Sequence, residues 1–172
     1  MTDSLAEKTG TDVRYRTPTP KDALTVWQMV VNEPMLDDNS SYYYTLWFRD
    51  FAKTSMVATV GDEIVAFMTG YRRPEEPRTY FIWQAAIRPD SGISGLGVGI
   101  FVNAIDAQLA AGAEYVETSV SKKNRAIVML LHMVANEYDA DVHTELLFPA
   151  EDLPDGDHDE VLYRIGPLTP RT

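Results

Sequence analysis

The chain contains no cysteine, and this absence excludes disulfide bonds and metal sites built from thiolates. No run of residues approaches the roughly 20 apolar positions of a membrane-spanning helix, so we expect no membrane partner. Cations are also scarce, because 15 Lys and Arg residues stand against 26 Asp and Glu residues and the net charge is −11. Since nucleic-acid binding depends on cations that neutralise phosphates, we expect no nucleic-acid partner either.

The length of 172 residues fits one compact domain and is short for two. Residues 1–12 are polar and lack the basic and then apolar order of a secretory signal, so we expect a cytoplasmic protein. No internal repeat or low-complexity segment divides the chain. We therefore expect a flexible N-terminus over 1–12, a single domain over 13–166 and a tail over 167–172.

Hydrophobic periodicity and turn signals predict strands that alternate with helices. The dipeptide Gly61-Asp62 between two β-rich runs indicates a hairpin, and therefore antiparallel pairing. The other expected strands are 12–16, 79–87, 113–120, 141–148 and 160–165. The expected helices begin behind Thr19 and then span 39–52, 96–111 and 124–138. This order predicts an α/β (α+β) fold with a mixed, mainly antiparallel sheet and helices on both faces.

A glycine-rich stretch, RPDSGISGLGVGIF (88–101), joins the strand 79–87 to the next helix. A Walker-type phosphate loop requires Gly-Lys-Ser or Gly-Lys-Thr, but this chain has Gly99-Ile100-Phe101. A dinucleotide fold requires a third glycine where Ile100 stands, and it also requires repeated parallel βαβ units. Two interpretations are left: the free N–H groups of the helix start bind a diphosphate, or the glycines only permit close helix packing.

The element order and the Gly95-Leu96-Gly97 turn resemble the GNAT acetyltransferases, whose corresponding loop holds the diphosphate of coenzyme A. Four segments are similar to the diaminobutyrate acetyltransferases of ectoine biosynthesis, a family within the GNAT superfamily. They are LDDNSSYYY (36–44), 67–87, VETSVSKKN (116–124) and HDEVLYRI (158–165). This resemblance implies a homodimer without a metal that moves acetyl from acetyl-CoA to the γ-amine of L-2,4-diaminobutyrate.

The resemblance also implies the cosubstrate site. The residues that it assigns to acetyl-CoA are Gln84, Ala85, Ala86, Ile87, Gly92, Gly95, Leu96, Gly97 and Asn124. The loop departs from the family, because Gly92-Ile93 replaces the usual Arg-Gly and removes one charged phosphate contact. The cations Lys122, Lys123 and Arg125 are candidates to replace it, with a solvated helix start as the alternative. Asn124 has the alternative of a simple helix cap.

For the amine substrate the resemblance implies Asp37, Tyr42 and Trp83 as catalytic and binding residues. Asp37 would hold an amino group or relay its proton, unless it only caps the helix 39–52. Tyr42 would orient the substrate, or it is simply one of three adjacent tyrosines. Trp83 would stack on the ammonium group, or it belongs to the core. The further substrate-binding candidates are Asn39, Thr118 and His158. For His158 the resemblance implies that the acidic loop EDLPDGDHDE folds back over the acceptor site, unless the loop is simply solvated.

The chemistry requires removal of a proton from an alkyl ammonium group before the amine attacks the thioester directly in a ternary complex. Many GNAT enzymes have a tyrosine acid in the helix that follows Asn124, but this chain has Met129-Leu130-Leu131 in that region, so we assign no general acid. Two alternatives remain open. One is a GNAT enzyme for another diamine or polyamine, although Arg72 and Arg73 could select a carboxylate. The other is a catalytically silent acyl-CoA-binding module.

Overall fold

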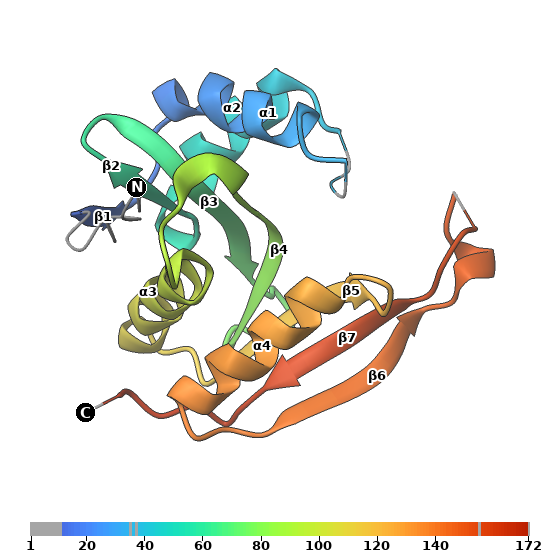
Figure 1. The fold of residues 1–172 in the computed structure, drawn as a ribbon. Helices are drawn as coiled ribbons and strands as arrows, with labels where there is room; N and C mark the ends of the chain where they lie inside the picture. Colours follow the sequence, from blue (N-terminus) through green and yellow to red (C-terminus); the bar gives the residue numbers. More distant parts are fainter. Residues whose placement is uncertain (1–11, 35, 37, 155, 172) are drawn as a thin grey trace, which may run out of the picture.

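The computed structural model describes residues 12–34, 36, 38–154 and 156–171 (Figure 1). A seven-stranded sheet has the order β1-β2-β3-β4-β5-β7-β6. Its strands are β1 (Val13–Arg16), β2 (Met56–Val60), β3 (Glu63–Arg72), β4 (Thr79–Ile87), β5 (Tyr115–Ser121), β6 (Val142–Phe148) and β7 (Glu160–Ile165). Only the pairing of β4 with β5 is parallel within the described sheet.

Two helices cover each face of the sheet. They are α1 (Ala23–Val31) and α2 (Ser41–Asp50) on one face, and α3 (Leu96–Ala110) and α4 (Arg125–Glu137) on the other. Four short 3-10 turns complete the elements: η1 (Pro20–Asp22), η2 (Ala52–Thr54), η3 (Pro89–Ser91) and η4 (Ala150–Asp152). The predicted mixed, mainly antiparallel α/β fold is therefore confirmed.

The sheet separates two apolar clusters. The cluster beneath α1 and α2 includes Val26, Phe48 and Phe67, all buried. The larger cluster lies against α3 and α4 and includes Ile100 and Leu131. Each such fully buried side chain contributes about 1.5–3 kcal/mol of apolar transfer free energy, so both helix layers are held to the sheet by burial.

Local signals explain where several elements begin. Gly61 adopts a φ of 57° in the turn between β2 and β3, as the hairpin prediction requires. Pro20 follows Thr19 at the start of η1, and α1 continues directly from that turn. Within the described ranges, none of the helices combines the length and the apolar character needed to traverse a lipid bilayer.

Candidate active site

The centre of β4 contains a bulge. Thr69 of β3 lies opposite Gln84, but the next residue, Gly70, lies opposite Ile82, so Trp83 is the extra residue. Trp83 and Gln84 both contact α2 as a result. A Cβ on Gly70 would lie 2.6 Å from the Tyr80 ring, so glycine is required for β3 to approach the strand here.

Beyond the bulge, β4 separates from β5. The parallel register runs only from Thr79 opposite Tyr115 to Ile82 opposite Thr118, whereas β5 continues to pair with β7 as far as Ser121. The two strands therefore diverge toward their carboxyl ends, as Figure 1 shows. Along 83–87 the edge of β4 that faces β5 has no strand partner in the described sheet. An extended ligand could pair with this edge as an added strand.

The glycine-rich turn follows the open end of β4. Gly92 and Gly95 have φ values of 62° and 74°, which favour glycine, and a Cβ at either position would meet no atom within 4 Å. The first helical bond of α3 runs from Gly99 N to Gly95 O over 2.8 Å, so the preceding N–H groups have no helical acceptor. Open space beside uncommitted N–H groups fits a diphosphate.

The packing interpretation applies to the two later glycines. A Cβ on Gly97 would lie 3.0 Å from Ile87 Cδ1, and a Cβ on Gly99 would overlap the Tyr15 hydroxyl. The stretch therefore serves two purposes: Gly92 and Gly95 shape an open turn, whereas Gly97 and Gly99 let α3 pack closely.

An aromatic cluster covers the bulge on the α2 side. The Trp83 ring is 5.1 Å from Tyr43 and 5.4 Å from Trp47, measured between centroids, and Trp83 remains 40% exposed. Trp83 is therefore placed at the surface and not in the core. Tyr42 is 70% exposed, so Tyr43 is the tyrosine of the three that contacts Trp83. Burial raises the pKa of Tyr43, whose hydroxyl has no hydrogen-bond partner among the described residues.

The third adjacent tyrosine, Tyr44, joins the bulge to the chain before α2. Its buried hydroxyl donates to Gln84 Oε1 over 2.6 Å and also makes a side-chain hydrogen bond with Asn39. Burial raises the pKa of Tyr44, and these two hydrogen bonds act in the opposite direction. The structure thus brings together Asn39, a substrate candidate, and Gln84, a cosubstrate candidate, through a residue that the sequence analysis missed. The sequence signal that could have identified Tyr44 was its spacing of four residues from Phe48, which puts both side chains on one face of α2.

Asp37 lies outside the described residues. The cap of α2 is Ser40, whose Oγ accepts a hydrogen bond from Tyr43 N over 3.2 Å. The capping role that was the alternative for Asp37 is therefore filled by another side chain.

The remaining candidates lie around the divergence of β4 and β5. Thr118 is buried at the last position of β5 that pairs with β4. Asn124 caps α4, and its Oδ1 accepts from Ile127 N over 3.3 Å. His158 lies on the connection between β6 and β7, with Nε2 3.1 Å from Glu160 Oε1. This connection extends past the ends of both strands in Figure 1 and does not fold back over β4 of the same chain.

The two arginines considered for carboxylate recognition are engaged elsewhere. Arg72 donates to the carbonyl of Pro77 over 2.7 Å, at the beginning of β4 and not at its open end. Arg73 lies 3.2 Å from Glu117, a carboxylate only 3% exposed that also pairs with Arg164. Both arginines therefore contact groups at the closed end of the sheet, and the suggestion that they select a carboxylate stays a prediction.

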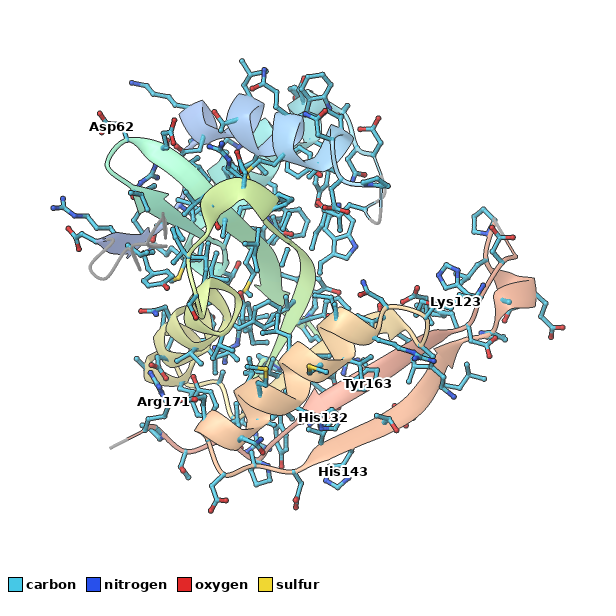
Figure 2. The ribbon with its side chains drawn as sticks, in the orientation of Figure 1. Asp62, Lys123, His132, His143, Tyr163 and Arg171 are labelled. Carbon is cyan, nitrogen blue, oxygen red and sulfur yellow. The ribbon has the colours of Figure 1, made fainter. Side chains whose placement is uncertain are left out.

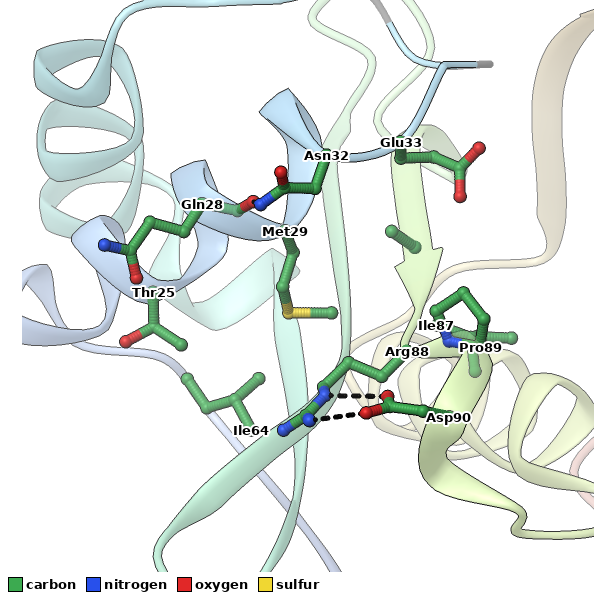
Figure 3. Close-up of a pocket in the computed structure, with 11 residues that line it drawn as sticks. Thr25, Gln28, Met29, Asn32, Glu33, Ile64, Ile87, Arg88, Pro89 and Asp90 are labelled. Carbon is green, nitrogen blue, oxygen red and sulfur yellow. Dashed lines mark hydrogen bonds and ion pairs between the residues drawn. The ribbon is translucent and has the colours of Figure 1, made fainter.

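A pocket of about 410 Å³ flanks the open end of β4, between that strand and α1 (Figure 3). Gln28, Met29 and Asn32 line it from α1. Arg88 lies on the other side with Nη2 3.0 Å from Asp90, and it also pairs with Glu63 over 3.6 Å. In the part of the chain that the structure describes, no group of three or more His, Asp and Glu side chains is arranged to hold a metal.

Comparison with known proteins agrees with this geometry. The chain matches the acetyltransferase (GNAT) family over residues 21–131. It is 37% identical over 164 residues to the L-2,4-diaminobutyric acid acetyltransferase of Nocardia farcinica, covering 95% of this chain and 84% of that protein. With the Streptomyces avermitilis enzyme of the same name it shares 40% identity over 162 residues, covering 91% and 89%.

A solved structure is also similar. The diaminobutyrate acetyltransferase of Paenibacillus lautus, in complex with its substrate L-2,4-diaminobutyric acid and coenzyme A, superposes with a TM-score of 0.86 at 32% identity. The match covers 95% of this chain and 99% of that one. The chain therefore belongs to the GNAT acetyltransferase family and, within it, to the L-2,4-diaminobutyric acid acetyltransferases.

Proposed function

We propose that this protein transfers acetyl from acetyl-CoA to the γ-amine of L-2,4-diaminobutyrate, a step of ectoine biosynthesis in the cytoplasm. One observation carries the proposal. The divergence of β4 from β5, followed by an open glycine turn, occurs in a chain that matches almost the whole length of an enzyme bound to diaminobutyrate and coenzyme A.

The open half of β4 is the place for acetyl-CoA. Backbone groups of Gln84 to Ile87 would pair with the pantetheine arm and polarise the thioester carbonyl. The diphosphate would lie on the N–H groups around Gly92 and Gly95–Gly97, and Asn124 borders the same opening from α4. These groups are fixed by the bulge and by the helix start, so they would be oriented before the substrate binds.

The amine must lose a proton before it can attack. An alkyl ammonium with a pKa of about 10.4 requires roughly 4 to 5 kcal/mol for deprotonation at pH 7. We propose that Asp37 binds the amino group or relays its proton, that Trp83 stacks against the ammonium and that Tyr42 orients it. Asn39, Thr118 and His158 complete the proposed amine pocket. The neutral amine then attacks the carbonyl, and coenzyme A leaves as the thiol.

A homodimer is part of the same proposal. Leu146 and Phe148 of β6 are exposed beside the connection that carries His158. A contiguous exposed apolar patch is typical of protein interfaces, and we propose that these two side chains form part of one. The connection extends away from β4 of its own chain, and we propose that it contacts a second copy of the chain.

The test is turnover with a panel of amines. Purified protein is incubated with acetyl-CoA and diaminobutyrate, ornithine, lysine or putrescine, and the release of free thiol is measured. We expect the highest kcat/KM with diaminobutyrate and acetylation at its γ-nitrogen. Preference for another amine would replace the proposed substrate, and acetyl-CoA binding without thiol release would indicate a silent binding module.

A further inference from the structure

A chain of hydrogen bonds crosses the bulge in β4. The Thr69 hydroxyl of β3 donates to the backbone carbonyl of Gln84 over 3.3 Å. The Tyr44 hydroxyl of α2 donates to Gln84 Oε1 over 2.6 Å, and Tyr44 also makes a side-chain hydrogen bond with Asn39. Tyr44 and Thr69 are 0% exposed and Gln84 is 6% exposed. Three buried side chains therefore link β3, β4, α2 and the segment before α2.

The surroundings of Tyr44 are apolar. Beneath α2, side chains fill the space down to the sheet (Figure 2). The Tyr44 ring lies 6.3 Å from Phe67 and 6.4 Å from Phe48, measured between centroids. A phenylalanine ring could make the same contacts, and the replacement of two hydrogen-bonded partners by apolar groups of the same shape can leave stability nearly unchanged. Packing alone therefore does not explain why polar groups lie here.

The two ends of this chain of hydrogen bonds border the two parts of the proposed site. Gln84 begins the open edge of β4, to which we assign acetyl-CoA, directly after the bulge. Asn39 belongs to the segment between α1 and α2 that also carries Asp37, the proposed ligand of the amino group. Tyr44 hydrogen-bonds to both Gln84 and Asn39, so it connects the cosubstrate edge with the amine-binding segment.

Hydrogen bonds fix a separation more strictly than ring contacts do. Trp83 also contacts α2 through the rings of Tyr43 and Trp47, but aromatic pairs tolerate centroid separations of about 4.5–7 Å. Hydrogen bonds from a hydroxyl to an oxygen are confined to about 2.5–3.0 Å. Because a misplacement of about 1 Å can slow a reaction about 100-fold, a strict link between the two binding segments would increase the rate.

We propose that Tyr44 and the side chain of Gln84 are positioning residues, whose hydrogen bond fixes the amine-binding segment against the open edge of β4. Neither side chain touches the reacting atoms. Thr69 extends the link to β3, and Asn39 extends it to the segment before α2. This inference rests on the proposed function, because the amine and the thioester must meet beside the bulge for the link to align them.

Steady-state kinetics of Tyr44→Phe tests the inference, with Tyr80→Phe as the matched control. Tyr80 is also 0% exposed, and its hydroxyl donates to the carbonyl of Thr54 over 2.7 Å, but it lies where β4 still pairs with β5. We expect Tyr44→Phe to lower kcat with diaminobutyrate about tenfold and to leave both KM values within about twofold, because the substrates bind but are misaligned. Tyr80→Phe should lower the melting temperature by a similar amount and keep kcat within about twofold.

A second variant, Gln84→Met, removes the amide oxygen that accepts from Tyr44 and keeps the length of the side chain. We expect it to lower kcat about tenfold as well. The double variant Tyr44→Phe/Gln84→Met should lie within about twofold of Gln84→Met alone, because residues that act through one bond are not additive. The pH dependence of kcat should keep its shape in Tyr44→Phe, since a positioning residue carries no proton.

Several results would overturn the inference. They are an unchanged kcat in either folded single variant, equal losses of kcat in Tyr44→Phe and Tyr80→Phe, and losses that multiply in the double variant. A shifted pH profile in Tyr44→Phe would make Tyr44 a proton carrier instead. A wild-type protein that does not acetylate diaminobutyrate would contradict the proposed function itself, whereas wild-type turnover with unaffected variants would contradict only this inference.

Discussion

The two halves of β4 differ in what lies beside them. Residues 80–82 pair with β3 on one side and β5 on the other, and Tyr80 and Ile82 are completely or almost completely buried. Residues 84–87 pair with β3 alone, and the unpaired Trp83 before them reaches the surface. One strand therefore supplies a closed anchor and an open edge, and the bulge at Trp83 marks the boundary.

The open half of β4 offers backbone groups to a ligand, and the closed half holds that strand in the sheet. Beside the closed half, Glu117 of β5 pairs with Arg164 of β7 and with Arg73 directly after β3, and Arg164 also donates to Thr79 of β4 over 3.4 Å. The open half continues the same strand, so its direction is set by the closed half, which is paired on both sides. Changes in the closed half should therefore lower stability, whereas changes around the open half should lower activity.

The largest effect is expected from Glu117→Ala in the closed half. The substitution leaves Arg73 and Arg164 without their buried partner, and we expect the free energy of unfolding to fall by about 3 kcal/mol in urea denaturation. Glu114→Ala is the control, because Glu114 forms an exposed pair with Arg78 over 2.9 Å and should cost less than about 1 kcal/mol. Equal losses of unfolding free energy in the two variants would show that the buried Glu117 pairs stabilise the protein no more than the exposed Glu114 pair.

Asp37→Ala tests the amine pocket that we propose beside the open half of β4. If Asp37 binds the amino group, kcat/KM for diaminobutyrate should fall about 100-fold, since acid–base groups contribute on the order of 10²–10⁴-fold. The melting temperature should change little, because Ser40 caps α2. Asp38→Ala is the matched control and should retain most activity. A loss of melting temperature in proportion to the loss of activity would make Asp37 a structural residue.

Gly70→Ala tests the close approach at the bulge. The added methyl group would meet the Tyr80 ring at 2.6 Å and the Phe81 carbonyl oxygen at 2.7 Å. We expect a loss of about 2 kcal/mol in unfolding free energy, in the range of overpacked cores. The measurement is again urea denaturation, and a change below about 0.5 kcal/mol would mean that β3 relaxes easily around the bulge.

The smallest expected effect on stability concerns the hydroxyl groups of Tyr43 and Tyr44. Tyr44→Phe removes the hydrogen bond to Gln84 and should cost about 1 kcal/mol of stability. Tyr43→Phe removes a buried hydroxyl that has no hydrogen-bond partner in the described part of the chain, so the protein should be equally stable or slightly more stable. Thermal denaturation of the two variants side by side gives the comparison, and a larger loss for Tyr43→Phe would show that its hydroxyl is bonded in solution.

Much of the architecture was predictable because it depends on local signals. The hairpin at Gly61, the strand 79–87 and the glycine turn were all located from residue type and spacing. The family was recognisable from four segments spread along the chain. The choice among Tyr42, Tyr43 and Tyr44 was not predictable, because adjacent helix positions differ by about 100° and only packing decides which one meets Trp83.

By itself the sequence determined the order of elements, the family and the region in which acetyl-CoA and the amine are proposed to meet. Periodicity, glycine turns and charge act over a few residues, so they can be read along one chain. The tertiary structure decided the bulge at Trp83, the point after Ile82 where β4 leaves β5, and the partners of Tyr44 and Glu117. These features depend on residues tens of positions apart, and only the packed sheet brings them into contact.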